Sequence, residues 1–229
     1  MIQKLDSGYI VNINKPVQWT SFDVVKKVRR ITRIKRVGHA GTLDPFATGV
    51  LLICMGKATK QVPSLMNLTK EYEAIVALGR TTDTLDITGK FIAEKPVPLF
   101  MENQVKEVFR QFTGTIQQKI PAYSAAKIGG RRSYALARKG LEIPERLKTV
   151  SIHRFKLLHF NSSEIHFIVE CGRGTYIRTL GYDIAVALGT TGYLTHLTRK
   201  RIGEYRVEEA LSVKEFEQQW ETEKQYGNN

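Results

Sequence analysis

The hydrophobic residues of this 229-residue sequence recur with two different periods, and the alternation of the two periods constrains the fold class. Every second residue is apolar over 8–13, 72–78 and 164–171, as in strands with one buried face. Apolar residues instead follow the helical period over about 21–31 and 101–112. Because strand and helix patterns are intermixed, the sequence predicts an α/β or α+β fold with a mixed sheet.

Local signals predict several further elements. Thr20 and Asp23 are spaced as in a capping box, which would begin the first helix. The apolar run at 49–56 is typical of a buried strand, and 172–189 is expected to run from a glycine loop into a helix. We expect short strands in the remaining tail and a last helix near 213–222. No internal repeat occurs, and the length suits one well-cored domain spanning 1–229.

The charge balance points to an anionic partner. Lys and Arg exceed Asp and Glu by 13, which favours nucleic acid, although a solvated basic surface would give the same count. No apolar run approaches the length that spans a bilayer, and the N-terminus lacks the apolar core of a signal peptide, so we expect no membrane role. Cys54 and Cys171 lie in apolar, strand-like runs and are predicted to be buried, reduced thiols of a cytoplasmic protein.

Residues 119–148 differ in composition from the rest of the chain. They hold eight Lys or Arg against two Glu, together with Gly129-Gly130 and Pro144. This composition predicts a basic flap rather than core, although a solvated loop is an alternative. A second basic cluster ends the first helix at 29–36, where cations also suit the helix dipole.

The segment at 38–45, GHAGTLDP, is the most unusual in the chain. It places His39, Thr42 and Asp44 within six residues, between glycines that let the backbone turn tightly. Pro45 favours an extended conformation for Asp44, which would direct the carboxylate outward. Asp44 is therefore a candidate catalytic residue, but Asp-Pro and Gly-His are also common in ordinary turns.

Two other residues could assist such a carboxylate. Arg178 could hold a nearby carboxylate ionised, and Tyr72 could stack on a nucleobase. Structural alternatives are a helix-surface cation for Arg178 and a core aromatic for Tyr72. No Cys/His cluster with metal-ligand spacing and no phosphate-binding glycine loop occurs, so we expect neither a metal nor another cofactor.

The sequence resembles the TruB family, the tRNA pseudouridine synthases that act on the T-loop uridine conventionally numbered 55. The resemblance covers about residues 8–206 and rests on five successive motifs: KPVQWTSFDVV (15–25), GHAGTLDPFATGVLLICMGKATK (38–60), KEYEAIVALGRTTDTLDITG (70–89), IPAYSAAKIGGRRSYALARKG (120–140) and CGRGTYIRTLGYDIAVALG (171–189). It implies the pseudouridine synthase fold, a mixed and largely antiparallel sheet flanked by helices and RNA-binding loops. It also implies an isomerase that binds the T-arm of tRNA without an obligate protein partner.

The resemblance implies roles for matching positions. Asp44 would be the catalytic aspartate, Arg178 would pair with it, and Tyr72 would stack on the flipped uracil and assist proton removal at C5. The flap at 119–148 would be the thumb that clamps the RNA loop. Further substrate-binding positions implied by the motifs are His39, which would fill the space that the flipped base leaves, Tyr176 and Leu197 in the uracil pocket, Lys15 and Lys60 in support of the site and the RNA backbone, and Lys127, Arg131 and Arg132 in the flap.

The sequence departs from the family pattern at two places. The resemblance ends near residue 206 and a Glu/Gln-rich helix follows, so we expect no C-terminal PUA domain. The flap begins IPAYSA where a double proline is more usual. Three other functions stay open: a non-catalytic RNA-binding protein, a DNA-binding protein, and a hydrolase that uses His39 and Asp44 as acid and base.

Overall fold

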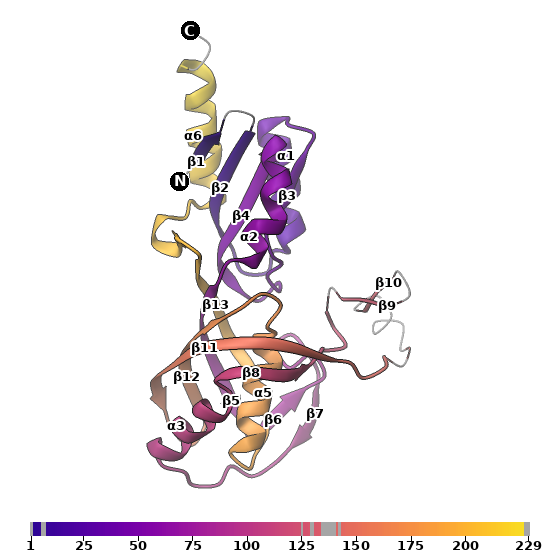
Figure 1. Ribbon diagram of the computed structural model, residues 1–229, viewed down its shortest axis with the longest axis vertical. Helices are drawn as coiled ribbons and strands as arrows, with labels where there is room; N and C mark the ends of the chain where they lie inside the picture. Colours follow the sequence, from indigo (N-terminus) through magenta and orange to yellow (C-terminus); the bar gives the residue numbers. More distant parts are fainter. Residues whose placement is uncertain are drawn as a thin grey trace. The chain divides into compact units, whose positions relative to one another are not determined.

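The chain folds into two compact units in the computed structural model (Figure 1). The structure describes residues 2–5, 8–124, 126–128, 131–133, 141 and 143–226. The N-terminal unit comprises residues 1–72 and 198–229, and the central unit comprises residues 73–197. Strands β5 (Lys70–Leu78) and β13 (Gly192–Ile202) each run from one unit into the other. That the two units act as one catalytic domain stays a prediction.

The sheet of the N-terminal unit is built around β4 (Thr48–Gly56). Strand β2 (Gly8–Lys15) pairs with β4 in antiparallel register, and β1 (Ile2–Leu5) adds to the outer edge of β2. On its other side β4 pairs with β3 (Val37–His39) and, in parallel, with the end of β13. The short β14 (Tyr205–Arg206) pairs with β13.

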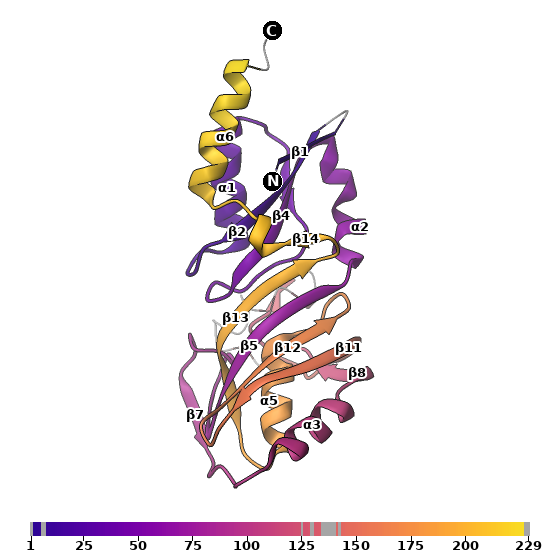
Figure 2. The same cartoon turned by 90° about the vertical axis from the view of Figure 1, so that its left-hand side faces the viewer.

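Both faces of this sheet are covered, which explains why β4 is an unbroken apolar run. One face packs against α1 (Ser21–Thr32) and α6 (Val213–Tyr226), and the other against the short helices η1 (Lys57–Gln61) and α2 (Val62–Asn67). Leu51, Ile53 and Met55 lie on the face covered by α1 and α6. Val50, Leu52 and Cys54 lie on the face covered by η1 and α2. Figure 2 shows α6 and α1 in this unit. An ion pair between Lys27 and Glu217 joins the two helices.

The predicted capping box begins α1. The Thr20 hydroxyl accepts a hydrogen bond from the Asp23 amide at 3.1 Å, and the Thr20 amide donates to the Asp23 carboxylate at 3.0 Å. Two donors that the first helical turn would leave open are thereby satisfied. The start of α1 is therefore determined locally, and the residues that follow Thr20 are held in a defined orientation.

The central unit holds a sheet in the order β13-β5-β12-β11-β8. Strands β8 (Gly114–Lys119), β11 (Leu147–Phe160) and β12 (Glu164–Cys171) pair in antiparallel register. A separate hairpin is formed by β6 (Arg80–Thr82) and β7 (Phe91–Glu94). Helix α3 (Glu102–Gln111) packs on β11 and β12 through the rings of Phe109, Phe155 and Phe167.

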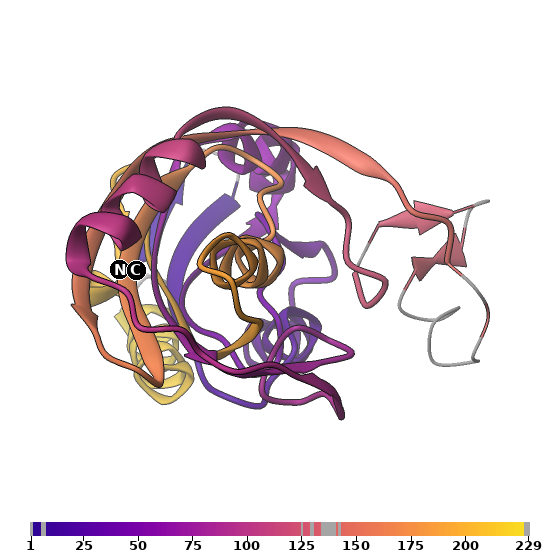
Figure 3. The same ribbon diagram turned by 90° about the horizontal axis from the view of Figure 1, so that it is seen from below.

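Helix α5 (Ile177–Ala187) lies directly against this sheet and is seen end-on in Figure 3. A Cβ atom on Gly181 would lie 2.8 Å from Val76 of β5 and 3.0 Å from Leu194 of β13. Only glycine therefore permits the close approach of helix and sheet at this position. None of the described helices has the length and apolar character needed to cross a membrane.

Most predicted elements are confirmed, including the mixed and largely antiparallel sheet, the four helices and the burial of Cys54 and Cys171. The prediction of only short strands after residue 189 is wrong, because β13 spans eleven residues. Within the predicted flap, the structure describes β9 (Lys127–Ile128) and β10 (Arg131–Arg132), which form a two-stranded pair. Residues 125, 129–130, 134–140 and 142 of the flap lie outside the described residues.

Candidate active site

The Asp44 loop, residues 40–47, connects β3 to β4 in the N-terminal unit. Two glycines have positive φ here: Gly41 within the loop, with φ +93°, and Gly49, the second residue of β4, with φ +99°. A Cβ atom on Gly49 would lie 2.3 Å from the Arg199 carbonyl oxygen, so no other residue fits there. The Asp44 side chain is half-buried. The backbone carbonyl of Asp44 accepts a hydrogen bond from the Ala47 amide at 3.1 Å.

Three side chains from outside the loop hold its backbone. The Arg199 guanidinium donates to the Gly41 carbonyl at 3.1 Å, and the Lys15 ammonium donates to the Pro45 carbonyl at 3.3 Å. The Ser21 hydroxyl contacts Leu43 between them, donating to its carbonyl at 3.2 Å. Arg199, Lys15 and Ser21 are all buried. Such contacts on alternate residues leave the Asp44 backbone little freedom.

The surroundings of the loop are positively charged. Burial lowers the pKa of the Lys15 ammonium to about 8, against the opposing attraction of the Asp44 carboxylate, and the nearby Arg199 guanidinium lowers this pKa further. Lys15 also donates to the carbonyls of Pro16 at 2.8 Å and Trp19 at 2.6 Å. Two buried cations, Lys15 and Arg199, therefore hold the backbone of the Asp44 loop, and the Lys15 ammonium is attracted by the Asp44 carboxylate.

The other predicted site residues of this unit lie on three different elements. His39 is the last residue of β3 and is half-buried, Lys60 is exposed on η1, and Tyr72 is largely buried on β5. A pocket of about 360 Å³ in this unit is lined by Lys15 and by Asn14, Pro16, Thr48, Thr198, Val207 and Ser212. The substrate contacts proposed for His39, Lys60 and Tyr72 stay predictions.

Arg178 lies in the first turn of α5 in the central unit, and its side chain is buried. Its guanidinium donates to the carbonyls of Thr84 at 2.5 Å and Tyr123 at 2.8 Å. It also lies 3.5 Å from the carboxylate of Asp86, and both side chains are at most 5 % exposed. The alternative that Arg178 is a helix-surface cation is therefore wrong.

Asp86 was not predicted from the sequence as a site residue. Its second carboxylate oxygen accepts hydrogen bonds from the Thr84 hydroxyl at 2.9 Å, the Thr88 amide at 2.9 Å and the Thr88 hydroxyl at 2.5 Å. These bonds hold the carboxylate in the orientation in which it faces Arg178. The available signal was a pair of aspartates, Asp83 and Asp86, in a threonine-rich loop.

The remaining predicted site residues also lie in the central unit. Tyr176 precedes α5, and the Gln118 side chain accepts from its amide at 2.7 Å and donates to its carbonyl at 3.0 Å. Leu197 is buried on β13. Lys127 lies in β9, and Arg131 and Arg132 lie in β10.

Asp44 and Tyr72 belong to the N-terminal unit, whereas Arg178, Tyr176 and Leu197 belong to the central unit. The ion pair between Asp44 and Arg178 therefore stays a prediction.

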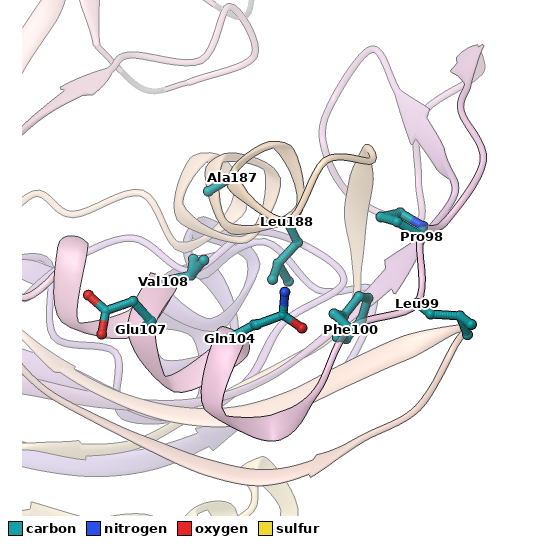
Figure 4. Close-up of a pocket in the computed structure, with 8 residues that line it drawn as sticks. All are labelled: Pro98, Leu99, Phe100, Gln104, Glu107, Val108, Ala187 and Leu188. Carbon is teal, nitrogen blue, oxygen red and sulfur yellow. The ribbon is translucent and has the colours of Figure 1, made fainter.

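A second pocket, of about 350 Å³, lies in the central unit between α3, the end of α5 and the segment before α3 (Figure 4). Its walls are mainly apolar, with Pro98, Phe100, Val108 and Leu188 among them, and it includes none of the predicted site residues. Among the described residues, no group of three or more His, Cys, Asp or Glu is placed to hold a metal ion.

Comparison with known proteins identifies the family. The model of the TruB family pseudouridylate synthase, N-terminal domain, matches residues 29–177. The chain is 44% identical over 216 residues to tRNA pseudouridine synthase B of Phocaeicola vulgatus, covering 91% of this chain and 92% of the relative. It is 42% identical over 210 residues to the protein of that name from Clostridium tetani, covering 92% of this chain and 73% of the relative.

Solved structures agree with this similarity. A chain of a Cbf5-Nop10-Gar1 complex superposes with a TM-score of 0.72 at 28% sequence identity, covering 97% of this chain and 57% of that chain. A chain of an H/ACA RNP bound to a substrate RNA containing 2′-deoxyuridine superposes with a TM-score of 0.70 at 27% identity, covering 97% of this chain and 56% of that chain. Because the family model and these relatives match most of its length, the chain belongs to the TruB family of pseudouridylate synthases.

Proposed function

We propose that this protein isomerises a uridine in the T-loop of tRNA to pseudouridine, with Asp44 as the catalytic carboxylate. The observation that carries the proposal is the Asp44 loop of a TruB family chain, whose backbone is held by Ser21, Lys15 and Arg199. A loop that only connected two strands would not need three buried polar side chains to hold it, since each must be desolvated. The relatives named tRNA pseudouridine synthase B support tRNA as the substrate.

The reaction requires the uridine to leave the stack of bases. The bond between uracil N1 and the ribose breaks, the uracil rotates, and C5 bonds to the same ribose carbon. The proton on C5 is then removed and N1 gains a proton, so the product is an isomer of uridine. Extruding the base costs a few kcal/mol, and stacking on an aromatic ring returns about 1–3 kcal/mol. We propose that Tyr72 supplies this ring and assists removal of the C5 proton. Tyr176 and Leu197 would line the uracil pocket, and His39 would fill the vacated space.

Asp44 must be ionised, whether its carboxylate attacks carbon or removes a proton. Within the N-terminal unit, the Lys15 ammonium and the Asp44 carboxylate attract each other. We propose that Arg178 pairs with Asp44 when the substrate is bound. Asp86 and two backbone carbonyls hold the Arg178 guanidinium. The orientation of the guanidinium is therefore set before it pairs with the Asp44 carboxylate.

Binding of the T-arm would combine two kinds of contact. Phosphate contacts from Lys60, Lys127, Arg131 and Arg132 would supply affinity without sequence information, and contacts to loop bases would supply specificity. We propose tRNA as the partner, with no obligate protein subunit. We also propose a cytoplasmic location, where buried thiols such as Cys54 and Cys171 stay reduced.

The test is incubation of the protein with an unmodified tRNA transcript, followed by nucleoside analysis. Pseudouridine has the mass of uridine and is revealed by its carbodiimide adduct at the T-loop position. Release of free uracil would instead indicate a hydrolase. Tight binding without conversion would indicate an RNA-binding protein, and equal affinity for duplex DNA a general nucleic-acid-binding protein.

A further inference from the structure

Ser21 makes an unusual pair of hydrogen bonds with the residue that precedes Asp44. Its hydroxyl accepts a hydrogen bond from the Leu43 amide at 2.9 Å and donates one to the Leu43 carbonyl at 3.2 Å. A serine hydroxyl can donate and accept at once, so one small side chain satisfies both backbone groups of Leu43. Ser21 is 2 % exposed, and water therefore does not replace it.

The Ser21 hydroxyl is not needed to cap α1. Ser21 is the first residue of the helix, and the preceding Thr20 forms the capping box with Asp23. The two bonds of Ser21 instead reach 22 positions along the chain, to the Asp44 loop. The start of a rigid helix thereby holds this loop, which is the arrangement expected where backbone position matters for function.

We propose that Ser21 is a positioning residue for Asp44, an inference that rests on the proposed function. With both backbone groups of Leu43 held, the Asp44 Cα is displaced only if a buried bond breaks. Displacement of a reacting group by about 1 Å can cost about a hundredfold in rate. Ser21 therefore acts on the chemical step through Asp44 and contributes little to RNA affinity.

The chain offers a closely matched control for the loss of this hydroxyl. Thr32 lies at the other end of the same helix and is 5 % exposed. Its hydroxyl donates to the Val28 carbonyl at 2.9 Å and accepts from the Ile34 amide at 3.2 Å. Thr32→Val removes a buried hydroxyl with the same two kinds of bond but without a contact to the Asp44 loop.

The experiment compares Ser21→Ala and Thr32→Val with the parent in single-turnover pseudouridine formation on unmodified tRNA. Enzyme in saturating excess makes the observed rate independent of the folded fraction. Affinity for tRNA and Tm are measured on the same samples. We expect both variants to lose a similar amount of stability and to bind tRNA within twofold of the parent. The Ser21→Ala rate falls at least tenfold, whereas the Thr32→Val rate stays within twofold.

Equal rates in the two variants would overturn the role of Ser21, as would a tenfold loss of affinity with an unchanged rate. If Ser21→Ala does not fold, Ser21→Cys keeps the volume and weakens both hydrogen bonds. A parental rate in Ser21→Cys would then overturn the proposal, and a reduced rate with intact affinity would support it. A parent that forms no pseudouridine would contradict the proposed function, whereas an active parent with an equally active Ser21→Ala contradicts only the positioning role.

Discussion

The Arg178 guanidinium lies 3.5 Å from the Asp86 carboxylate, and both side chains are almost completely buried. This ion pair joins the first turn of α5 to the loop between β6 and β7 within the central unit. Hydrogen bonds to Asp86 from Thr84 and Thr88 hold the acceptor in place. Arg178 is therefore oriented by contacts within its own unit, and Asp86 places a negative charge beside the guanidinium.

Replacing Asp86 by asparagine would remove a carboxylate that is buried against the Arg178 guanidinium. Breaking a buried ion pair in this way costs about 3–5 kcal/mol, so Asp86→Asn is expected to unfold at markedly lower urea concentration and to turn over slowly. The control is Asp83→Asn in the same loop. From the described residues, the Asp83 carboxylate accepts a long 3.4 Å bond from Tyr123 and a backbone bond from Lys90. An Asp86→Asn protein no less stable than Asp83→Asn would contradict the importance of the pair.

Arg178→Lys keeps the charge but loses the planar fork that reaches two carbonyls at once. We expect the rate of pseudouridine formation to fall by about a hundredfold, or roughly 2.7 kcal/mol in the barrier, with a modest change in tRNA affinity. Rapid-quench rates together with filter binding give the two quantities. A fully active lysine variant would show that only the charge at this position matters.

Tyr72 can be tested with two substitutions that separate its ring from its hydroxyl. Phenylalanine keeps the face that would stack on uracil, and leucine removes the face as well. If the ring stacks on the base and the hydroxyl assists loss of the C5 proton, both variants bind tRNA and both turn over poorly. Normal turnover in Tyr72→Leu would make Tyr72 a core aromatic only.

Elements with local signals were predictable from the sequence. The capping box of α1 needs only Thr20 and Asp23, and the apolar stripe of that helix repeats within a few residues. Strand β13 has no comparable signal, because its buried residues include Arg199 and the alternation breaks between Leu194 and Leu197. Strands are recognised in a sequence by alternating apolar residues, and a buried arginine breaks that pattern. Arg199 can be buried because its guanidinium donates to the carbonyls of Gly41 and Val50.

Candidate site residues could be predicted where they lie in a recognisable sequence motif. Residues whose role depends on a contact with a distant part of the chain could not. Asp44 and Arg178 belong to recognisable segments. Asp86 has the same composition around it as Asp83, and only the fold shows which of the two is buried against Arg178. Ser21 was likewise missed, because its partner Leu43 lies beyond the range of helix and turn signals.

Asp183 on α5 gives a prediction for the pH dependence of stability. Burial raises the pKa of its carboxyl from about 3.8 to about 6, and the opposing attraction of Lys119 is smaller. Between pH 4 and 6 the folded protein therefore binds more protons at this position than the unfolded chain, and its contribution to stability is lost as pH rises through this window. Asp183→Asn removes the titration.

Relative to Asp183→Asn, the parent is expected to lose about 1 kcal/mol of unfolding free energy from pH 4 to pH 7, a value reduced for the partial exposure of the side chain. Urea unfolding of both proteins at the two pH values measures this difference. If the unfolding free energies of the parent and Asp183→Asn differ by the same amount at pH 4 and at pH 7, folding does not raise the pKa of Asp183.

The catalytic assignment of Asp44 is tested most directly by Asp44→Asn on unmodified tRNA. Asparagine has nearly the shape of aspartate but cannot act as an ionised carboxylate, so the fold and the tRNA affinity should survive. Pseudouridine at the T-loop position is measured by its carbodiimide adduct under single-turnover conditions, with the parent assayed in parallel. We expect full conversion by the parent and none by Asp44→Asn. Conversion by Asp44→Asn within tenfold of the parental rate would contradict the account.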